Sequence, residues 1–374
     1  MKALGPRLAQ IVALSLCGPA AHAIILYSTG DPTANTTAPT GALANSGWQY
    51  ENSFLSFNGY PIAPDSFVVS KHILGALQTP GNPSVNFTYL GQTYTTVARF
   101  DAPNGGDLTV LKIDPAINGP FPSFVPLYRK TDELGKNFVV FGRGSERGPE
   151  VNIPPTAITT ASPNGTFRGW EWGGNTGTQR WGENTVSQIL TDSGPGGVQQ
   201  FLYSNFTPPT AGGLANEAAL SVGDSSGGVF ILDIDDNTWK LAGLNSGVDA
   251  TFIVPPGITP INMALIDAGG LYDGTNQLQD TTNLDLAFGP DYQVYSGSGP
   301  FSHLVGNYHT RISTLTPWLD SIAFVPEAPP SAGLLAGAVF VGGWWISRRN
   351  RMESATASSE NPKLRWTSGR PAHP

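Results

Sequence analysis

Short runs of β-branched and aromatic residues, separated by Gly, Pro and Asn, recur along this chain from about Ile24 to Phe324. Runs of this kind are typical of β-strands, and the residues between them are typical of turns. The clearest runs cover residues 66–69, 87–90, 94–100 and 137–141. A helical apolar period stands out only over 313–323. The sequence therefore predicts an all-β body followed by one C-terminal helix.

Composition narrows the class of protein. Of 374 residues, 45 are Gly and 32 are Pro, and only 13% are charged, which favours frequent turns over long surface helices. A formal net charge of −8 leaves no basic face to replace phosphate counterions, so we expect no nucleic-acid partner. The single cysteine, Cys17, lies in the N-terminal apolar segment, so a chain without that segment has no disulfides. We expect neither a metal nor another cofactor.

Two segments lack the clear alternation of a strand. Residues 161–187 are rich in Gly, Thr, Asn and Trp, and residues 247–300 have a similar character. We expect both to be loop-like insertions on the β scaffold. Segments of this kind commonly carry recognition.

The N-terminus has the features of a secretory signal peptide. Lys2 and Arg7 precede an apolar run over 11–17, and residues 21–23 read Ala-His-Ala. We expect residues 1–23 to be removed by cleavage after Ala23. The apolar run is too short to span a bilayer by itself, and Leu16 before Cys17 fits a lipoprotein cleavage site poorly.

The C-terminal region carries a second topological signal. Residues 325–329 read Val-Pro-Glu-Ala-Pro, an apolar stretch covers 332–346, and three arginines follow by residue 351. We expect a short transmembrane helix with its arginines on the cytoplasmic side, although a buried core helix is the alternative.

The same pattern resembles the bacterial PEP-CTERM sorting tag. The resemblance implies a membrane anchor over 325–351 and processing by an exosortase-like enzyme. Two departures are visible: Ala328 replaces the usual proline, and a polar tail follows over 352–374.

Three segments each contain one residue suited to acyl transfer, in the chain order His, Asp, Ser. Residues 67–72 read Phe-Val-Val-Ser-Lys-His, and residues 106–113 read Gly-Asp-Leu-Thr-Val-Leu-Lys-Ile. Residues 223–230 read Gly-Asp-Ser-Ser-Gly-Gly-Val-Phe. These motifs resemble those of chymotrypsin-like serine proteases. The resemblance covers roughly residues 24–250 and implies two six-stranded antiparallel β-barrels.

The resemblance also assigns boundaries and roles. Barrel 1 would cover about 24–125 and barrel 2 about 126–324. His72, Asp107 and Ser225 would form the catalytic triad. Asp107 would accept a hydrogen bond from the imidazole, and the backbone N–H groups of Gly223 and Ser225 would stabilise the oxyanion.

Other residues compete for these roles. Asp101 and Asp114 lie near Asp107, but neither directly precedes the strand. Ser226 occupies a position that is glycine in the family and is a rival nucleophile. Register favours Ser225, because choosing Ser226 would displace Asp224 and the following strand by one residue.

The resemblance extends to substrate recognition. Ser246 and Gly247 stand at the edge that pairs with substrate backbone, and Ala219 stands at the base of the primary pocket. Because Ala219 is not acidic, we expect a small or apolar substrate side chain rather than Lys or Arg. Cleavage after Ala23 would also expose Ile24, whose ammonium would pair with Asp224 as in trypsin-like enzymes.

These features predict an exported serine endopeptidase with a polypeptide substrate, located in the periplasm or at the cell surface. Two alternatives stay open. One is a catalytically impaired binding protein on the same scaffold, and the other is an anchored matrix or adhesion protein. All three share the membrane as a partner through the C-terminal segment.

Overall fold

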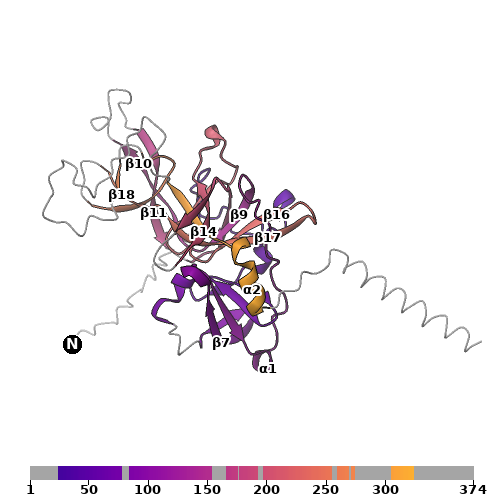
Figure 1. Ribbon diagram of the computed structural model, residues 1–374. Coiled ribbons are helices and arrows are strands. Elements are labelled where there is room, and N and C mark those ends of the chain that lie inside the picture. Colours follow the sequence, from indigo (N-terminus) through magenta and orange to yellow (C-terminus); the bar gives the residue numbers. More distant parts are fainter. Residues whose placement is uncertain are drawn as a thin grey trace, which may run out of the picture. The chain divides into compact units, whose positions relative to one another are not determined.

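The computed structural model describes residues 24–77, 84–153, 166–175, 177–192, 197–254, 259–268, 271–273 and 305–323. They belong to one compact unit that ends at Val325. These residues are mostly β, as the sequence predicts (Figure 1). The expected signal peptide, transmembrane helix and polar tail lie outside the described residues. Within the described ranges, no helix is long and apolar enough to cross a membrane.

An antiparallel five-stranded sheet is formed by the N-terminal part of the chain, with the strand order β4-β5-β8-β7-β6. Its strands are β4 (Tyr60–Ala63), β5 (Ser66–Val69), β6 (Asn86–Tyr89), β7 (Gln92–Asp101) and β8 (Thr109–Ile113), and a hairpin of β2 (Ser53–Phe54) and β3 (Phe57–Asn58) precedes them. The predicted strands over 66–69, 87–90 and 94–100 are thus confirmed, with shifted ends for the last two.

The second sheet has seven strands in the order β12-β9-β16-β17-β21-β14-β13. Its strands are β9 (Asn137–Gly142), β12 (Arg180–Thr185), β13 (Gln188–Asp192), β14 (Gln199–Asn205), β16 (Gly228–Asp233), β17 (Thr238–Val248) and β21 (Gly306–Arg311). The strand predicted over 137–141 corresponds to β9. The predicted C-terminal helix is confirmed as a 3₁₀ turn, η7 (Ser313–Leu315), followed by α2 (Thr316–Ala323).

A third sheet, which we call the accessory sheet, has the order β10-β11-β19-β18-β20. Its strands are β10 (Ser145–Ile153), β11 (Thr166–Asn175), β18 (Thr251–Ile253), β19 (Ile261–Leu265) and β20 (Tyr272–Asp273). A two-stranded ladder joins β1 (Ile25–Leu26) to β15 (Ala218–Ala219). The remaining elements are α1 (Pro115–Asn118), η1 (Gly41–Leu43), η2 (Trp48–Tyr50), η3 (Lys71–Leu77), η4 (Pro103–Gly105) and η5 (Pro209–Ala211).

The expectation that 161–187 and 247–300 are loop-like is wrong where the structure describes them. The first segment contains β11 and β12, and the second contains β18, β19 and β20. Gly169 in β11 accounts for part of the error, because a glycine at this point of the sequence suggests a turn. In the structure a Cβ at Gly169 would lie 2.1 Å from the carbonyl oxygen of Ala264 in the neighbouring strand. The glycine therefore permits close strand pairing rather than a turn.

The alternation of side chains along β5 explains how the first two sheets pack. Phe67 and Val69 belong to an aromatic cluster on one face of the five-stranded sheet, whereas Val68 lies on the opposite face. On that side Val68 shares a buried cluster with Phe230 of the seven-stranded sheet and Leu319 of α2. The two sheets and the C-terminal helix therefore enclose one continuous apolar core.

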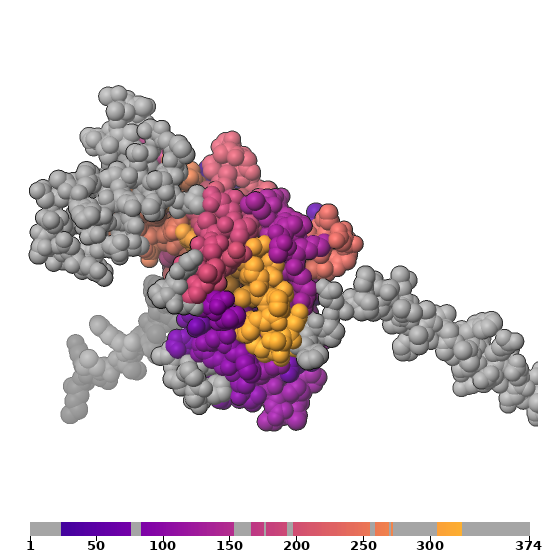
Figure 2. Space-filling model, in the orientation of Figure 1, coloured from indigo at the N-terminus to yellow at the C-terminus, as the bar shows by residue number. Residues whose placement is uncertain are grey.

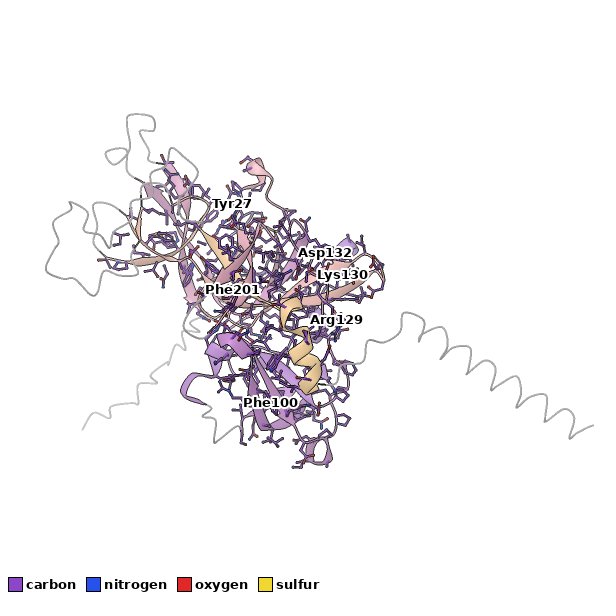
Figure 3. All side chains as sticks on the ribbon, viewed as in Figure 1. Tyr27, Phe100, Arg129, Lys130, Asp132 and Phe201 are labelled. Carbon is purple, nitrogen blue, oxygen red and sulfur yellow. The ribbon has the colours of Figure 1, made fainter. Side chains whose placement is uncertain are left out.

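Two ionic contacts fix the C-terminal segment on this core. Arg129 donates two hydrogen bonds of 2.7 Å to Asp320 of α2. Figure 3 labels Arg129 beside this helix. Fully buried Glu133 accepts from Nε of Arg311 at 2.9 Å and from Oγ of Ser313 at 2.5 Å. Figure 2 shows the orange C-terminal segment at the surface, next to the purple residues of the first sheet and the rose-coloured region that contains β13 and β14.

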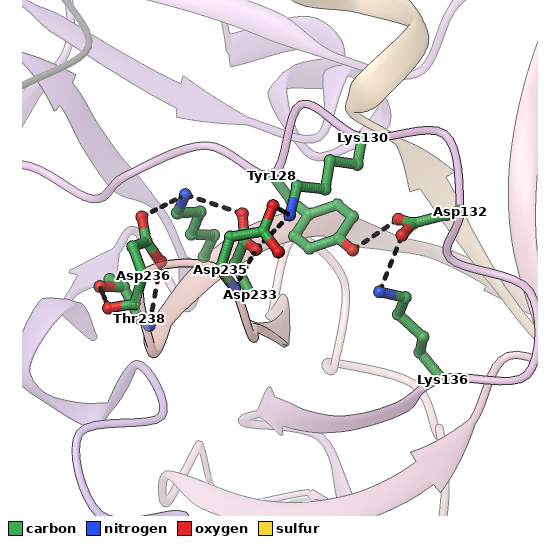
Figure 4. Close-up of polar contacts among 9 residues, drawn as sticks. Tyr128, Lys130, Asp132, Lys136, Asp233, Asp235, Asp236 and Thr238 are labelled. Atoms are coloured by element: carbon green, nitrogen blue, oxygen red, sulfur yellow. Dashed lines mark hydrogen bonds and ion pairs between the residues drawn. The ribbon is translucent and has the colours of Figure 1, made fainter. Parts of the chain in front are cut away.

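A polar cluster holds the turn between β16 and β17 (Figure 4). Asp233 accepts hydrogen bonds from Lys130 and Lys240, and Lys130 also contacts Asp235 at 2.6 Å. Burial works to raise the pKa of Asp233, but the hydrogen bonds from the two lysines outweigh it and hold that pKa below its usual value. Asp233 is therefore ionised and paired at neutral pH.

Candidate active site

Strand pairing brings His72 and Asp107 together. His72 follows β5 in the first turn of η3, and Asp107 lies two residues before β8. Because Val69 at the end of β5 pairs with Thr109 near the start of β8, the two side chains meet at the same edge of the sheet. His72 Nδ1 lies 2.7 Å from Asp107 Oδ2, and the backbone N–H of His72 donates to Oδ1 at 2.9 Å. This is the hydrogen bond that the sequence predicts for a catalytic dyad.

Residues of the seven-stranded sheet hold Asp107 from the other side. Ser246 in β17 donates from Oγ to Asp107 Oδ2 at 2.6 Å. Thr310 in β21 donates to the backbone oxygen of Asp107 at 3.2 Å, and Gln199 accepts from its backbone N–H at 3.3 Å. Sequence reasoning placed Ser246 at the substrate edge and missed its contact with the acid, because β17 and β8 are far apart in the chain.

The turn over 223–228 has a conformation that only certain residues tolerate. Gly223 has φ +97°, and a Cβ there would lie 2.3 Å from Nδ2 of Asn175. Ser226 has φ +63°, which side-chain-bearing residues seldom adopt. Among the described residues, the N–H groups of Gly223 and Ser225 donate to no acceptor. Two backbone N–H donors without acceptors in one tight turn are the groups from which an oxyanion hole is built.

The two adjacent serines occupy different environments. Ser226 is fully buried, and its Oγ accepts the backbone N–H of Ser70 at 2.9 Å. Ser225 is partly exposed and lines a small cavity of about 260 Å³ together with Ser246 and Gly247. Exposure beside a cavity is what a nucleophile requires, so the geometry favours Ser225 over Ser226.

No hydrogen bond joins Ser225 to His72 in the part of the chain that the structure describes. Catalytic hydrogen bonds are often long in unliganded enzymes and tighten when substrate binds. Ser225 is nevertheless linked to the dyad through the cavity, because Ser246 lines that cavity and donates to Asp107.

Asp224 lies beneath the turn and is almost completely buried. Its carboxylate accepts backbone N–H groups from Gly144 and Ser221, each at 2.7 Å, and the hydroxyl of Ser221 at 2.8 Å. A fourth donor is the backbone nitrogen of Ile24, 3.3 Å from Oδ1. Burial raises the pKa of Asp224 to about 6, because neighbouring hydrogen bonds only partly replace water.

Asn245 and His309 brace the same turn from behind. The Asn245 side chain donates to the backbone oxygens of Asp224 and Phe141, at 2.9 Å each, and its Oδ1 lies 2.8 Å from His309 Nδ1. Complete burial lowers the pKa of His309 to about 3, so the imidazole is neutral. Neither residue was a candidate from the sequence, since no local motif marks a buried amide–imidazole pair.

The cavity beside Ser225 differs from the expected primary pocket in one respect. Ala219 is buried in β15, where it pairs with Ile25, and it is not among the described residues that line the cavity. The predicted residues Ser246 and Gly247 do line it. A Cβ at Gly247 would meet no atom within 4 Å, so the space next to this strand is open.

Within the described ranges, no group of His, Cys, Asp and Glu side chains is arranged to hold a metal ion. No protein-family model matches this chain, and no curated protein matches its sequence. Its function must therefore be inferred from the geometry of the site.

Proposed function

We propose that this protein is an exported serine endopeptidase in which His72, Asp107 and Ser225 act as the catalytic triad. The observation that carries the proposal is the short His72–Asp107 hydrogen bond, supported by Ser246, which also lines the cavity beside Ser225. Such an arrangement fixes the imidazole tautomer with Nε2 available as the base.

The chemistry follows from these positions. His72 Nε2 accepts the Ser225 hydroxyl proton as Oγ attacks the substrate carbonyl carbon, and the N–H groups of Gly223 and Ser225 stabilise the resulting oxyanion. His72 then donates that proton to the leaving amine as the peptide bond breaks. Water, deprotonated by the same imidazole, hydrolyses the acyl-enzyme and regenerates Ser225.

The proposed scaffold is a chymotrypsin-like pair of antiparallel β-barrels. All strands of the five-stranded sheet lie within the predicted first barrel, 24–125, and all strands of the seven-stranded sheet lie within 126–324. The dyad comes from the first sheet and the nucleophile turn from the second. A site at the junction of two sheets supports this scaffold.

Maturation would proceed through the N-terminus. Removal of the signal peptide after Ala23 would turn the backbone N–H of Ile24 into an ammonium group. That nitrogen is already within 3.3 Å of Asp224, the buried carboxylate below the oxyanion turn. Export would thereby place an ammonium group beside Asp224 and order the turn.

Location and partners follow from the two terminal signals. We propose that the domain acts on polypeptides in the periplasm or at the cell surface, anchored through the segment 325–351. An exosortase-like enzyme would process that segment.

A test uses the full-length protein, exported and purified from its membrane fraction. We expect hydrolysis of an unfolded casein substrate, loss of hydrolysis in Ser225→Ala, and a large decrease in Asp107→Asn. The matched control is Ser226→Ala, which we expect to retain activity. Folded protein without hydrolysis would favour the second candidate, a catalytically impaired binding protein. The missing Ser225–His72 hydrogen bond is the observation that favours this alternative.

A further inference from the structure

The cavity beside Ser225 has a wall that comes from the accessory sheet. Trp172 of β11, Thr251 of β18 and Asn262 of β19 line it together with Ser225 and Ser246. At about 260 Å³ the cavity is smaller than the pockets that usually bind drug-sized ligands, and it suits one side chain. Because it opens beside the nucleophile, that side chain belongs to the substrate residue whose carbonyl is attacked.

The described residues that line this cavity carry no charge. A charged substrate side chain that enters it would lose hydration without gaining a counterion, which is unfavourable. Ser221 also lines the cavity, and its hydroxyl donates to the Asp224 carboxylate directly behind it. In the mature enzyme the Ile24 ammonium would neutralise that carboxylate, so an acidic side chain meets the same desolvation penalty as a basic one.

The wall of the accessory sheet offers hydrogen-bond donors. Thr251 Oγ donates to Asn262 Oδ1 at 2.9 Å, which leaves the Nδ2 group of Asn262 without an acceptor among the described residues. The indole N–H of Trp172 is buried and also has no acceptor in the described part of the chain. The penalty for a buried donor without a partner, roughly 1–3 kcal/mol, applies to Trp172 and favours an entering acceptor. Asn262 is exposed, so its amide is hydrated until a substrate acceptor replaces that water.

We infer that this cavity selects an uncharged carboxamide side chain, glutamine first, and that Asn262 is its specificity-determining residue. The carboxamide oxygen accepts from the Asn262 amide, and the carboxamide carries no charge to desolvate. This inference rests on the proposed peptidase function. It replaces the expectation of a small or apolar side chain with a hydrogen-bonding one.

The test measures kcat/KM on peptides that differ only at the residue before the scissile bond, namely Gln, Leu, Lys and Glu. We expect Gln to exceed each of the others by about tenfold or more. Asn262→Asp keeps the acceptor for Thr251 but replaces the free donor with a negative charge. We expect it to lower kcat/KM for Gln about tenfold and to raise it for Lys by a similar factor. The matched control is Asn152→Asp, an exposed position on β10 that does not line the cavity.

Two outcomes overturn the inference. One is wild-type cleavage of Leu, Lys or Glu peptides as fast as Gln peptides. The other is an Asn262→Asp variant whose ratio of kcat/KM for Gln peptides to kcat/KM for Lys peptides equals that of Asn152→Asp. Fluorophosphonate labelling, which needs no occupant of this cavity, distinguishes the two levels of failure. Labelling without a Gln preference refutes the specificity alone, whereas neither labelling nor hydrolysis refutes the peptidase function as well.

Discussion

Moving the mature N-terminus by one residue is expected to abolish most activity without unfolding the protein. The perturbation is a single Gly inserted between Ala23 and Ile24, so that signal cleavage leaves the ammonium group one residue away from its position. Asp224 would then face the backbone N–H of Ile24 at 3.3 Å, as it does in the uncleaved chain.

The structure sets the magnitude. A carboxylate whose pKa is about 6 instead of 3.8 carries a cost of roughly 3 kcal/mol when it is ionised at neutral pH. The Ile24 ammonium offsets that cost, and the inserted Gly removes the offset. If this free-energy cost destabilises the active conformation of the oxyanion turn next to Asp224, kcat/KM falls about 100-fold at pH 7.

The sign of the pH effect follows from the raised pKa. Protonation of Asp224 stabilises the folded Gly-inserted variant most below pH 3.8, and this stabilisation is lost as the pH rises through about 6. The difference in Tm between wild type and variant should therefore narrow between pH 7.5 and pH 5. Edman sequencing verifies the new N-terminus. Unchanged kcat/KM in a correctly cleaved variant would refute the reasoning.

Three further substitutions are predicted to separate catalysis from stability. Ser246→Ala removes a hydrogen bond to the Asp107 side chain, worth about 1.5–3 kcal/mol, so we expect kcat/KM to fall about 10- to 150-fold with little change in Tm; equal rates would contradict this. Glu133→Gln leaves buried Arg311 without its counterion, and urea unfolding should show a loss of about 3–5 kcal/mol, whereas a loss under 1 kcal/mol would contradict the ion pair's role. Asp233→Asn should cost about 1 kcal/mol at pH 7, and the difference from wild type should shrink as the pH falls from 3.8 through the lowered pKa of the folded protein, because the lowered pKa makes this stabilisation a property of the ionised form. A pH-independent difference would contradict the last prediction.

The sequence predicted elements whose signal is local. The strand over 66–69 was readable because a β-branched run ends at turn residues, and His72 follows it directly. The turn over 223–228 was readable from its Gly and Ser content, and Gly223 adopts a positive φ that glycine permits.

The parts that escaped prediction depend on contacts between distant segments. The strands of the accessory sheet contain Gly and Trp at close-packed positions such as Gly169, where residue type indicated a loop. The Ser246–Asp107 contact joins residues 139 positions apart, and the Asn245–His309 pair joins residues 64 apart. No local pattern encodes such pairs, because only the assembled sheets bring them together.

The central claim is that Ser225, and not the adjacent Ser226, is the nucleophile. Locating a covalent adduct on one of the two serines measures this most directly. The full-length exported protein is incubated with a fluorophosphonate, and tandem mass spectrometry locates the adduct within the peptide that contains residues 223–230. The expected result is an adduct on Ser225, still formed in Ser226→Ala and absent in both Ser225→Ala and His72→Ala. An adduct on Ser226, or no adduct in folded protein, would contradict the assignment of Ser225 as the nucleophile.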